Sequence, residues 1–390
     1  EEKGQQQARF FQERLNSEQN VSLLTGIPMG INDNIITRDV LTSCASKMLS
    51  EFIPPYDSTV NEKLRNSGAV LLGKLNMSEF SIGNSTENSY FGCVKNPWDL
   101  GKVAGGASGG AAAAVAAGMA CFALGSDTGG GIRLPSSFCG VVGLKPTYGL
   151  VSRYGLIALA SSLEQIGPIT RNTEDCALVL NAIAGYDPKD SVSRNIKHPD
   201  YTTFLKEDIK GLRIGIPKEY IEKGLQKEVK QRTLEACKIF ESLGAVVTEV
   251  SLPTTDYAIA AYYIISSAEA SSNLARHDGI KYGYRSEHYE DIEELYRKTR
   301  SKGFGFEVKK RIMQGAYFLS TECNDGYYKK ALKVRQLIFE DFRKAFNEVD
   351  IIVGPTTPET AFKMGEKTHP LKMCLNNIYR QLITYMISSY

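Results

Sequence analysis

Two glycine-rich segments decide the fold of this chain: Gly105-Gly-Ala-Ser-Gly-Gly110, which leads into an alanine-rich run, and Gly125-Ser-Asp-Thr-Gly-Gly-Gly-Ile-Arg133. The chain has 35 glycines among 390 residues, and 13 of them fall between Gly101 and Gly149. Glycine permits close approach of backbones and leaves N–H groups open to a ligand. We therefore expect a functional site in this region, built largely from backbone atoms.

The same segments raise the question of phosphate binding, because the amino end of a helix attracts anions. Neither segment contains G-x-x-x-x-G-K-[ST], and neither has G-x-G-x-x-G in the βαβ setting that dinucleotide binding requires. The spacing therefore argues against a nucleotide site.

Composition and charge exclude several classes of protein. A hydrophobic content of 42% is ample for a folded core, and 46 basic against 44 acidic residues leave a net charge of +2, so no direct nucleic-acid binding is expected. The eight cysteines are scattered without a CxxC pair, which predicts no metal site and no disulfide framework. We expect a reduced, cytoplasmic protein with no cofactor and with its four histidines on the surface.

The longest apolar run could be a membrane span or a buried helix. Its truly apolar part, Ala111 to Leu124, is shorter than the roughly 20 residues that a span needs. A tightly packed, alanine-rich buried helix is the better interpretation, and no membrane contact is expected.

The remaining pattern alternates helices with buried strands, which predicts an α/β fold with a large mixed β-sheet covered by helices on both faces. No composition shift marks a boundary, so residues 1–377 are expected to form a single large domain. The expected helices are residues 1–19, a helix capped by Asp57 or Ser58 that runs through Ser67, a helix from Thr173 to Gly185, one from Lys227 to Leu243, and a largely helical region from Tyr257 to Phe346. The expected strands lie within residues 27–36, 69–72, 211–216, 246–250 and 350–353.

Taken together, the glycine segments resemble the amidase signature family. The resemblance extends through Gly26-Ile-Pro-Met-Gly-Ile31, Lys74-Leu-Asn-Met77, Ser85-Thr-Glu87 and Gly143-Leu-Lys-Pro-Thr147. Within the family, the chain is most similar to the A subunits of glutamyl-tRNA(Gln) amidotransferases. The segments that point to this branch are Val151-Ser-Arg-Tyr-Gly155, Ala160-Ser-Ser-Leu-Glu-Gln-Ile-Gly-Pro-Ile-Thr170, Pro217-Lys-Glu-Tyr220, Ser267-Ala-Glu-Ala-Ser-Ser-Asn-Leu274 and Gly279-Ile-Lys-Tyr-Gly283.

The resemblance implies an amidase that uses two serines and a lysine. In the family one serine attacks the amide, a second serine in a cis peptide relays its proton, and the lysine is the final base. A hydroxyl needs such a base to act as a nucleophile, and the developing oxyanion needs preorganised donors. The resemblance assigns the oxyanion hole to the backbone of Thr128, Gly129, Gly130 and Gly131.

The three catalytic positions of the family carry other residues here. Asn32 stands in the place of the lysine, Ala107 in the place of the relay serine, and Gly131 in the place of the nucleophile. None of these side chains offers a base or a nucleophile, so no intact catalytic group is expected. Three neighbours, namely Ser108, Asp127 and Arg133, are interpreted as structural, the last two as a pair that orients the glycine turn.

The substrate side of the family site is partly kept. By resemblance, Tyr262 and Arg311 occupy positions that hold glutamine, and Asn377 falls near the position of the aspartate that takes its amino group. Residues 378–390 no longer resemble the family, and the fold is expected to be truncated, and so incomplete, at both ends.

Three functions remain open from the sequence. The main interpretation is a pseudoenzyme, a catalytically inactive binding or regulatory protein that pairs with amidotransferase subunits B and C or holds glutamine or another small amide. The alternative is a working amidase subunit that supplies ammonia for converting Glu-tRNA(Gln) to Gln-tRNA(Gln), and thus a part of a ligase in protein biosynthesis. The third possibility is a decayed product without function.

Overall fold

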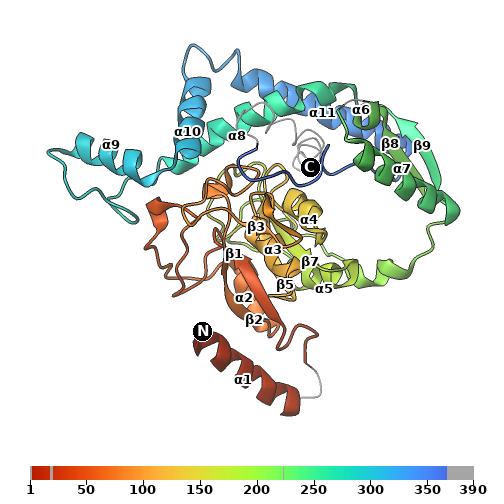
Figure 1. Cartoon of the computed structure of the whole chain (residues 1–390), viewed down its shortest axis with the longest axis horizontal. Coiled ribbons are helices and arrows are strands. Elements are labelled where there is room, and N and C mark those ends of the chain that lie inside the picture. The colour runs from red at the N-terminus through yellow and green to blue at the C-terminus, as the bar shows by residue number, and fades with distance from the viewer. Residues whose placement is uncertain (1, 18–20, 223, 367–390) are drawn as a thin grey trace.

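The computed structural model describes residues 2–17, 21–222 and 224–366, and its centre is a five-stranded mixed sheet (Figure 1). The strand order is β2-β1-β5-β7-β6, where β1 pairs in parallel with β2 and β5, while β7 runs antiparallel to β5 and β6. This arrangement confirms the predicted α/β class. The strands are β1 (Pro28–Asn32), β2 (Val70–Leu75), β5 (Phe122–Asp127), β6 (Val142–Gly143) and β7 (Gln165–Thr170).

Strands β5 and β7 are buried along their whole length, because helices cover both faces of this sheet. Phe122 and Leu124 of β5 pack with α2 (Thr59–Asn66) and α5 (Thr173–Ile183). Ala123, which points to the other face, packs with α3 (Gly109–Ala116) and α4 (Arg133–Cys139). As predicted, Ser58 caps α2, by accepting a hydrogen bond from the Asn61 N–H.

The prediction of one buried helix from Ala111 to Leu124 is wrong. Helix α3 ends at Ala116, Gly118 adopts a left-handed conformation with φ of 74°, and β5 begins at Phe122. A residue in the left-handed conformation ends a helix, and glycine adopts this conformation readily because it bears no Cβ. The apolar run therefore supplies both a helix and the central strand, and alanine content alone does not separate the two.

A second, three-stranded parallel sheet carries the predicted middle αβ unit. Its order is β10-β8-β9, formed by β8 (Arg213–Pro217), β9 (Val246–Val250) and β10 (Ile351–Ile352), with α6 (Lys218–Glu222) and α7 (Lys227–Ser242) between β8 and β9. Figure 1 shows β8 and β9 set apart from the central strands. Within the described residues, the single large sheet that was predicted is thus divided into two main sheets. The chain leaves the central sheet after α5 and forms the second sheet elsewhere.

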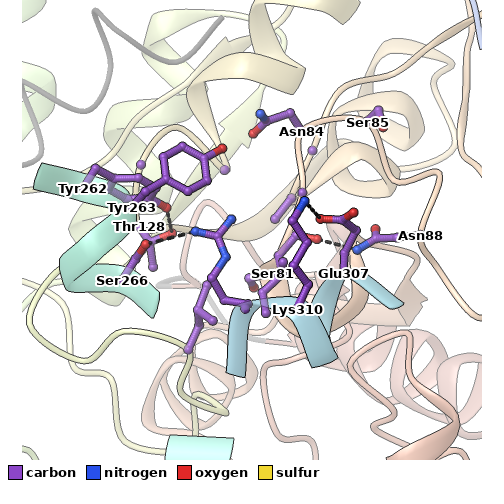
Figure 2. Close-up of a pocket in the computed structure, with 18 of the residues that line it drawn as sticks. Ser81, Asn84, Ser85, Asn88, Thr128, Tyr262, Tyr263, Ser266, Glu307 and Lys310 are labelled. Carbon is purple, nitrogen blue, oxygen red and sulfur yellow. Dashed lines mark hydrogen bonds and ion pairs between the residues drawn. The ribbon is translucent and has the colours of Figure 1, made fainter. Parts of the chain in front are cut away.

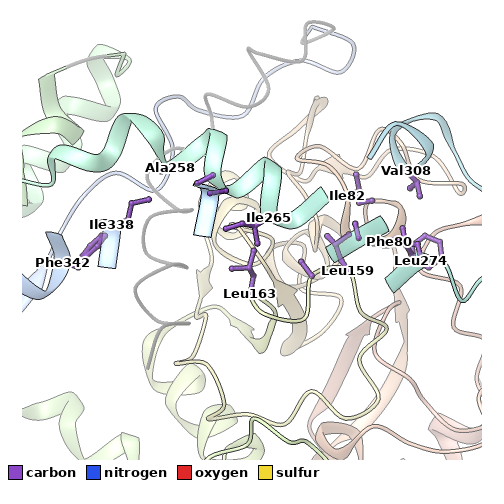
Figure 3. Packing of buried hydrophobic residues seen from close by; sticks show 14 of the residues in the cluster. Phe80, Ile82, Leu159, Leu163, Ala258, Ile265, Leu274, Val308, Ile338 and Phe342 are labelled. Atoms are coloured by element: carbon purple, nitrogen blue, oxygen red, sulfur yellow. The ribbon is translucent and has the colours of Figure 1, made fainter. Parts of the chain in front are cut away.

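Long helices pack with the second sheet. One buried apolar cluster includes Val250 of β9, Ile265 of α8 (Ala258–Leu274), Val308 of α10 (Phe306–Leu319) and Phe342 of α11 (Tyr328–Glu348). Figure 3 shows this cluster continuing to Phe80 beside the central sheet. The cluster therefore connects the second sheet and the long helices to residues outside the central strands, such as Phe80 and Leu159, while the residues of the central strands belong to two other buried clusters.

The other elements are peripheral. Helix α1 (Glu2–Ser17) lies against β2, and α9 (Ile292–Gly303) extends away from the sheets (Figure 1). The short elements are η1 (Lys47–Leu49), η2 (Glu79–Ser81), η3 (Tyr201–Lys206), η4 (Pro253–Tyr257) and the hairpin of β3 (Lys95–Asn96) with β4 (Asp99–Val103). The predicted tail of residues 378–390 lies outside the described residues.

Two further sequence expectations concern a membrane span and the exposure of the histidines. In the part of the chain that the structure describes, no helix combines the length and apolarity needed to cross a bilayer. The histidine prediction is wrong at His277, which is buried among Phe80, Tyr282 and Phe304, and burial lowers its pKa to about 4. A lone histidine in sequence gives no sign of such an aromatic surrounding.

The contact between α8 and α10 is tight enough to test by substitution. A Cβ at Gly315 of α10 would overlap the backbone carbonyl of Ser267 in α8, whereas a Cβ at Gly73 of β2 meets no atom within 4 Å. We expect Gly315→Ala to lower the free energy of unfolding by about 1–3 kcal/mol because the helices must separate. Urea denaturation measures this loss, and Gly73→Ala is the matched control that should not destabilise. Equal effects of the two variants would contradict the packing described.

Candidate functional site

A cavity of about 280 Å³ opens beside the glycine turn, which comprises residues 127–133. Its walls come from this turn, from residues 81–88, from α8 and from α10. In Figure 2, Thr128, Tyr262 and Ser266 lie on one side, and Glu307 and Lys310 lie on the other side near Asn88. The cavity is slightly smaller than the pockets of drug-sized ligands, which suits a molecule of amino-acid size.

Asp127 shapes the glycine turn. Its carboxylate is fully buried and accepts hydrogen bonds from the N–H groups of Gly130 (2.8 Å), Ile132 (3.1 Å) and Arg133 (3.3 Å). It also forms an ion pair with the Arg133 guanidinium at 2.8 Å. Burial alone would raise the pKa of Asp127, but the Arg133 charge and the N–H donors hold it well below its ordinary value. The carboxylate thus stays ionised and fixes the backbone of the turn.

This network involves part of the predicted oxyanion hole. The Gly130 N–H donates to Asp127 in this structure, so of the four predicted donors it is the one already bound within the turn, and the oxyanion hole itself stays a prediction. A Cβ on Gly129 would lie 2.6 Å from the Tyr262 ring, which shows how closely the turn and α8 approach. The N–H groups of Thr128, Gly129 and Gly131 stay as the predicted donors.

Two of the three family catalytic positions meet at the cavity wall. Ala107 and Gly131 both line the cavity, and a Cβ added to Gly131 would lie 3.4 Å from the Ala107 Cβ. The Gly106–Ala107 peptide bond is cis. Ser108 donates its N–H to the Gly131 carbonyl at 2.9 Å, and its hydroxyl lies against the Ser126 backbone, in keeping with its structural interpretation.

Asn32, the third position, belongs to a buried chain of amides and hydroxyls. Its Nδ2 donates to Asn34 Oδ1 at 3.1 Å, and Asn34 Nδ2 donates to Ser126 Oγ (2.8 Å) and Ser81 Oγ (3.0 Å). Ser81 in turn lines the cavity. A side-chain amide cannot accept a proton as a base, so this series of hydrogen bonds positions the Ser81 and Ser126 hydroxyls without activating them.

Two buried lysines near the site escaped the sequence interpretation. Burial lowers the pKa of Lys74 to about 8, and its ammonium donates to the Ile35 carbonyl and to Thr42 Oγ1 (2.9 Å). Burial, aided by the Arg133 charge, lowers the pKa of Lys145 to about 7. Both lie in motifs quoted for the family resemblance, but single-sequence patterns do not reveal that a lysine is buried.

The predicted ligand-binding residues come together on one wall. Tyr262 and Thr128 share a hydrogen bond of 3.2 Å between their hydroxyls. The Arg311 guanidinium lies 3.3 Å from Ser267 Oγ and stacks over the Tyr263 ring at 4.3 Å from its centroid. These contacts hold the cation at the cavity without neutralising it. Asn377 lies outside the described residues.

Helix α10 contributes residues that the sequence interpretation missed. The missed residues are Glu307, Lys310 and Gln314, which line the cavity together with the predicted Arg311 and share one face of the helix with it. Their i, i+3, i+4, i+7 spacing is visible in the sequence and indicates a shared helix face, but the local sequence does not show that this face borders a cavity. Among the described residues, no three His, Cys, Asp or Glu side chains gather in a way that could hold a metal ion.

Comparison with known proteins gives the same family as the motifs. The sequence profile of the family described as Amidase matches residues 2–387. The A subunit of glutamyl-tRNA(Gln) amidotransferase from Caldanaerobacter subterraneus subsp. tengcongensis is 60% identical over 91% of this chain and 73% of its own length. Its counterpart from Thermoanaerobacter pseudethanolicus is 58% identical over 96% of this chain and 77% of its own length.

Solved structures agree on the fold. The A subunit of the glutamyl-tRNA(Gln) amidotransferase from Thermotoga maritima is 39% identical, with a TM-score of 0.82 over 99% of this chain and 83% of that protein. A peptide amidase from Stenotrophomonas maltophilia is 28% identical, with a TM-score of 0.80 over 98% of this chain and 79% of that protein. The comparisons give no support to the expected truncation at both ends.

The buried ion pair gives a direct test of how the turn is built. We expect Asp127→Asn to lower the free energy of unfolding at neutral pH by about 3–5 kcal/mol, because Arg133 loses its partner. The lowered pKa means that the stabilisation is complete above the ordinary carboxyl value of 3.8 and is lost as the pH falls below it. Urea denaturation at neutral pH and at about pH 3 should therefore show a smaller difference between variant and parent in acid.

Asp350→Asn is the control for this test, because Asp350 pairs with Arg213 at 2.6 Å on the surface. Its effect should be much smaller at either pH. A loss at Asp127 no larger than the loss at Asp350 would contradict the role assigned to the buried pair.

Proposed function

Since this chain belongs to the amidase family, we propose that it serves as the A subunit of a glutamyl-tRNA(Gln) amidotransferase and binds glutamine in the cavity at the glycine turn. The observation that carries the proposal is that Arg311 and Tyr262 line the same cavity, where Tyr262 contacts Thr128 and Gly129 of the turn. A guanidinium suits the ligand carboxylate, and the turn then faces the side-chain amide.

The partners in this proposal are amidotransferase subunits B and C. The net charge of +2 gives this chain no strong attraction of its own for nucleic acid. Contact with the tRNA therefore comes through the partner subunits.

A first form of this function is hydrolysis of glutamine, with the ammonia passed to a partner that amidates Glu-tRNA(Gln). Identities of 57–60% to three amidotransferase A subunits support this form better than the inactive one. They also give no support to a loss of activity.

A second form, in which glutamine is held without being cleaved, is favoured by a specific observation. Ala107 and Gly131 at the cavity wall bring no hydroxyl, and Asn32 brings no base. In serine hydrolases, loss of the catalytic group leaves only the small acceleration that the oxyanion hole and binding provide. Both forms require the same ligand site, and they differ only in the fate of the amide.

Ligand binding tests the part common to both forms. We expect Arg311→Gln to weaken glutamine binding about 10–100-fold, because a hydrogen-bonded charge pair with the carboxylate is lost. Isothermal titration calorimetry measures the dissociation constant, with Arg232→Gln on the surface of α7 as the control that should bind like the parent. Failure of the parent chain to bind glutamine would refute the proposed function, and failure to unfold cooperatively would favour a decayed product.

Ammonia release separates the two forms. The second form predicts that the parent chain, assayed with subunits B and C, releases no ammonia from glutamine above background, and that Asn32→Lys, Ala107→Ser and Gly131→Ser together increase the rate. The chemical step gains a base, a relay and a nucleophile in that variant. A parent rate well above background, lost in Arg311→Gln, would establish the first form and exclude the second.

A further inference from the structure

The cavity holds two carboxylates to which no role has been given. Among its described lining residues, the acidic ones are Glu87 and Glu307, and the basic ones are Lys310 and Arg311. A free α-amino acid carries a carboxylate and an ammonium group on the same carbon atom. By resemblance, the family takes the ammonium group with an aspartate near position 377, where this chain carries Asn377, so a site that binds such a ligand through Arg311 needs another anion nearby.

Glu87 is committed to the protein. One of its oxygens accepts a hydrogen bond from the Ser85 hydroxyl at 2.6 Å, and the other accepts one from the Gly365 N–H at 2.7 Å. The carboxylate thus ties the cavity rim to the segment that follows β10. Turning it toward a ligand would break both bonds.

Glu307 is held much more weakly. Its contact with Lys310 measures 3.5 Å, spans three residues of the same helix, and involves side chains that are 44% and 32% exposed. Such partly exposed pairs contribute little to stability and are readily exchanged for another partner. Glu307 is therefore able to accept an incoming ammonium group.

The helix places Glu307 and Arg311 for joint use. They are four residues apart on α10, so their side chains rise from the same face with Cβ atoms about 6 Å apart. The Arg311 guanidinium leans toward Ser266 and Ser267 of α8. Figure 2 shows Glu307 on the opposite side of the cavity from Ser266. The two opposite charges therefore flank a space within reach of both.

We propose that Glu307 is a specificity-determining residue that receives the ammonium group of an α-amino acid whose carboxylate is bound by Arg311. The inference rests on the proposed glutamine site and goes further by stating which acid selects an amino acid over a simple amide. Helix α10 then holds the charged end of the ligand, and the side-chain amide extends to the glycine turn.

A purely structural explanation for Glu307 also exists, because an acidic residue in the first turn stabilises a helix through its dipole. That role would not depend on which ligand is bound. The two explanations are separated by comparing L-glutamine with its deaminated analogue, glutaramic acid, which keeps the carboxylate and the amide but lacks the amino group.

The experiment is calorimetric titration of both ligands into the parent chain and Glu307→Gln. The parent is expected to bind L-glutamine about tenfold or more tightly than glutaramic acid. In Glu307→Gln this preference should fall below about threefold through weaker glutamine binding, with glutaramic acid binding nearly unchanged. Glu293→Gln is the matched control, since Glu293 is an exposed acid in the first turn of α9, and it should keep the full preference.

The other outcomes overturn the inference. Equal weakening of both ligands in Glu307→Gln would show a structural role, and loss of the preference in Glu87→Gln instead would assign the ammonium group to Glu87. A parent that binds both ligands equally refutes the inference while leaving the proposed function intact. A parent that binds neither ligand refutes both.

Discussion

The site depends on one buried carboxylate at the end of the central strand. Asp127 closes β5, and it is compensated by Arg133 and by three backbone N–H groups of the turn that follows. An uncompensated buried charge costs several kcal/mol, so the turn cannot leave this conformation without a large penalty. The same contacts set the start of α4 and aim the Gly131 carbonyl at the Ser108 N–H, where α3 begins. Strand, turn and two helices are therefore fixed together.

The opposite wall of the cavity is fixed by different forces. Helices α8 and α10 pack closely through Gly315, and their apolar sides continue into the buried cluster that also contains Val250 of β9. The hydrogen bond between Thr128 and Tyr262 is a polar link from this layer to the turn. A polar turn thus faces a closely packed helix pair, and the charged side chains of α10 line the cavity between them.

Much of this arrangement could be predicted from local patterns. The Ser58 cap, the β9 strand and the helix that begins at Thr173 follow from short-range rules that the structure obeys. Long-range outcomes could not be predicted in this way. Asn34 joins Asn32 to Ser126 across 92 residues, the alanine-rich run divides at Gly118, and β8 and β9 separate from the central sheet. Each of these depends on packing partners that are distant in sequence.

The glycines of the site have a physical role that composition alone did not define. Gly105 lies against Pro135, and Gly129 lies beneath the Tyr262 ring, each at a distance that leaves no room for a Cβ. Gly131 follows the same principle, because a Cβ there would lie 2.5 Å from the Ser126 carbonyl oxygen. Any residue with a side chain at position 131 therefore needs the backbone around Ser126 to shift. The serine of Gly131→Ser can thus take part in the chemistry only if the end of β5 shifts to make room for its Cβ.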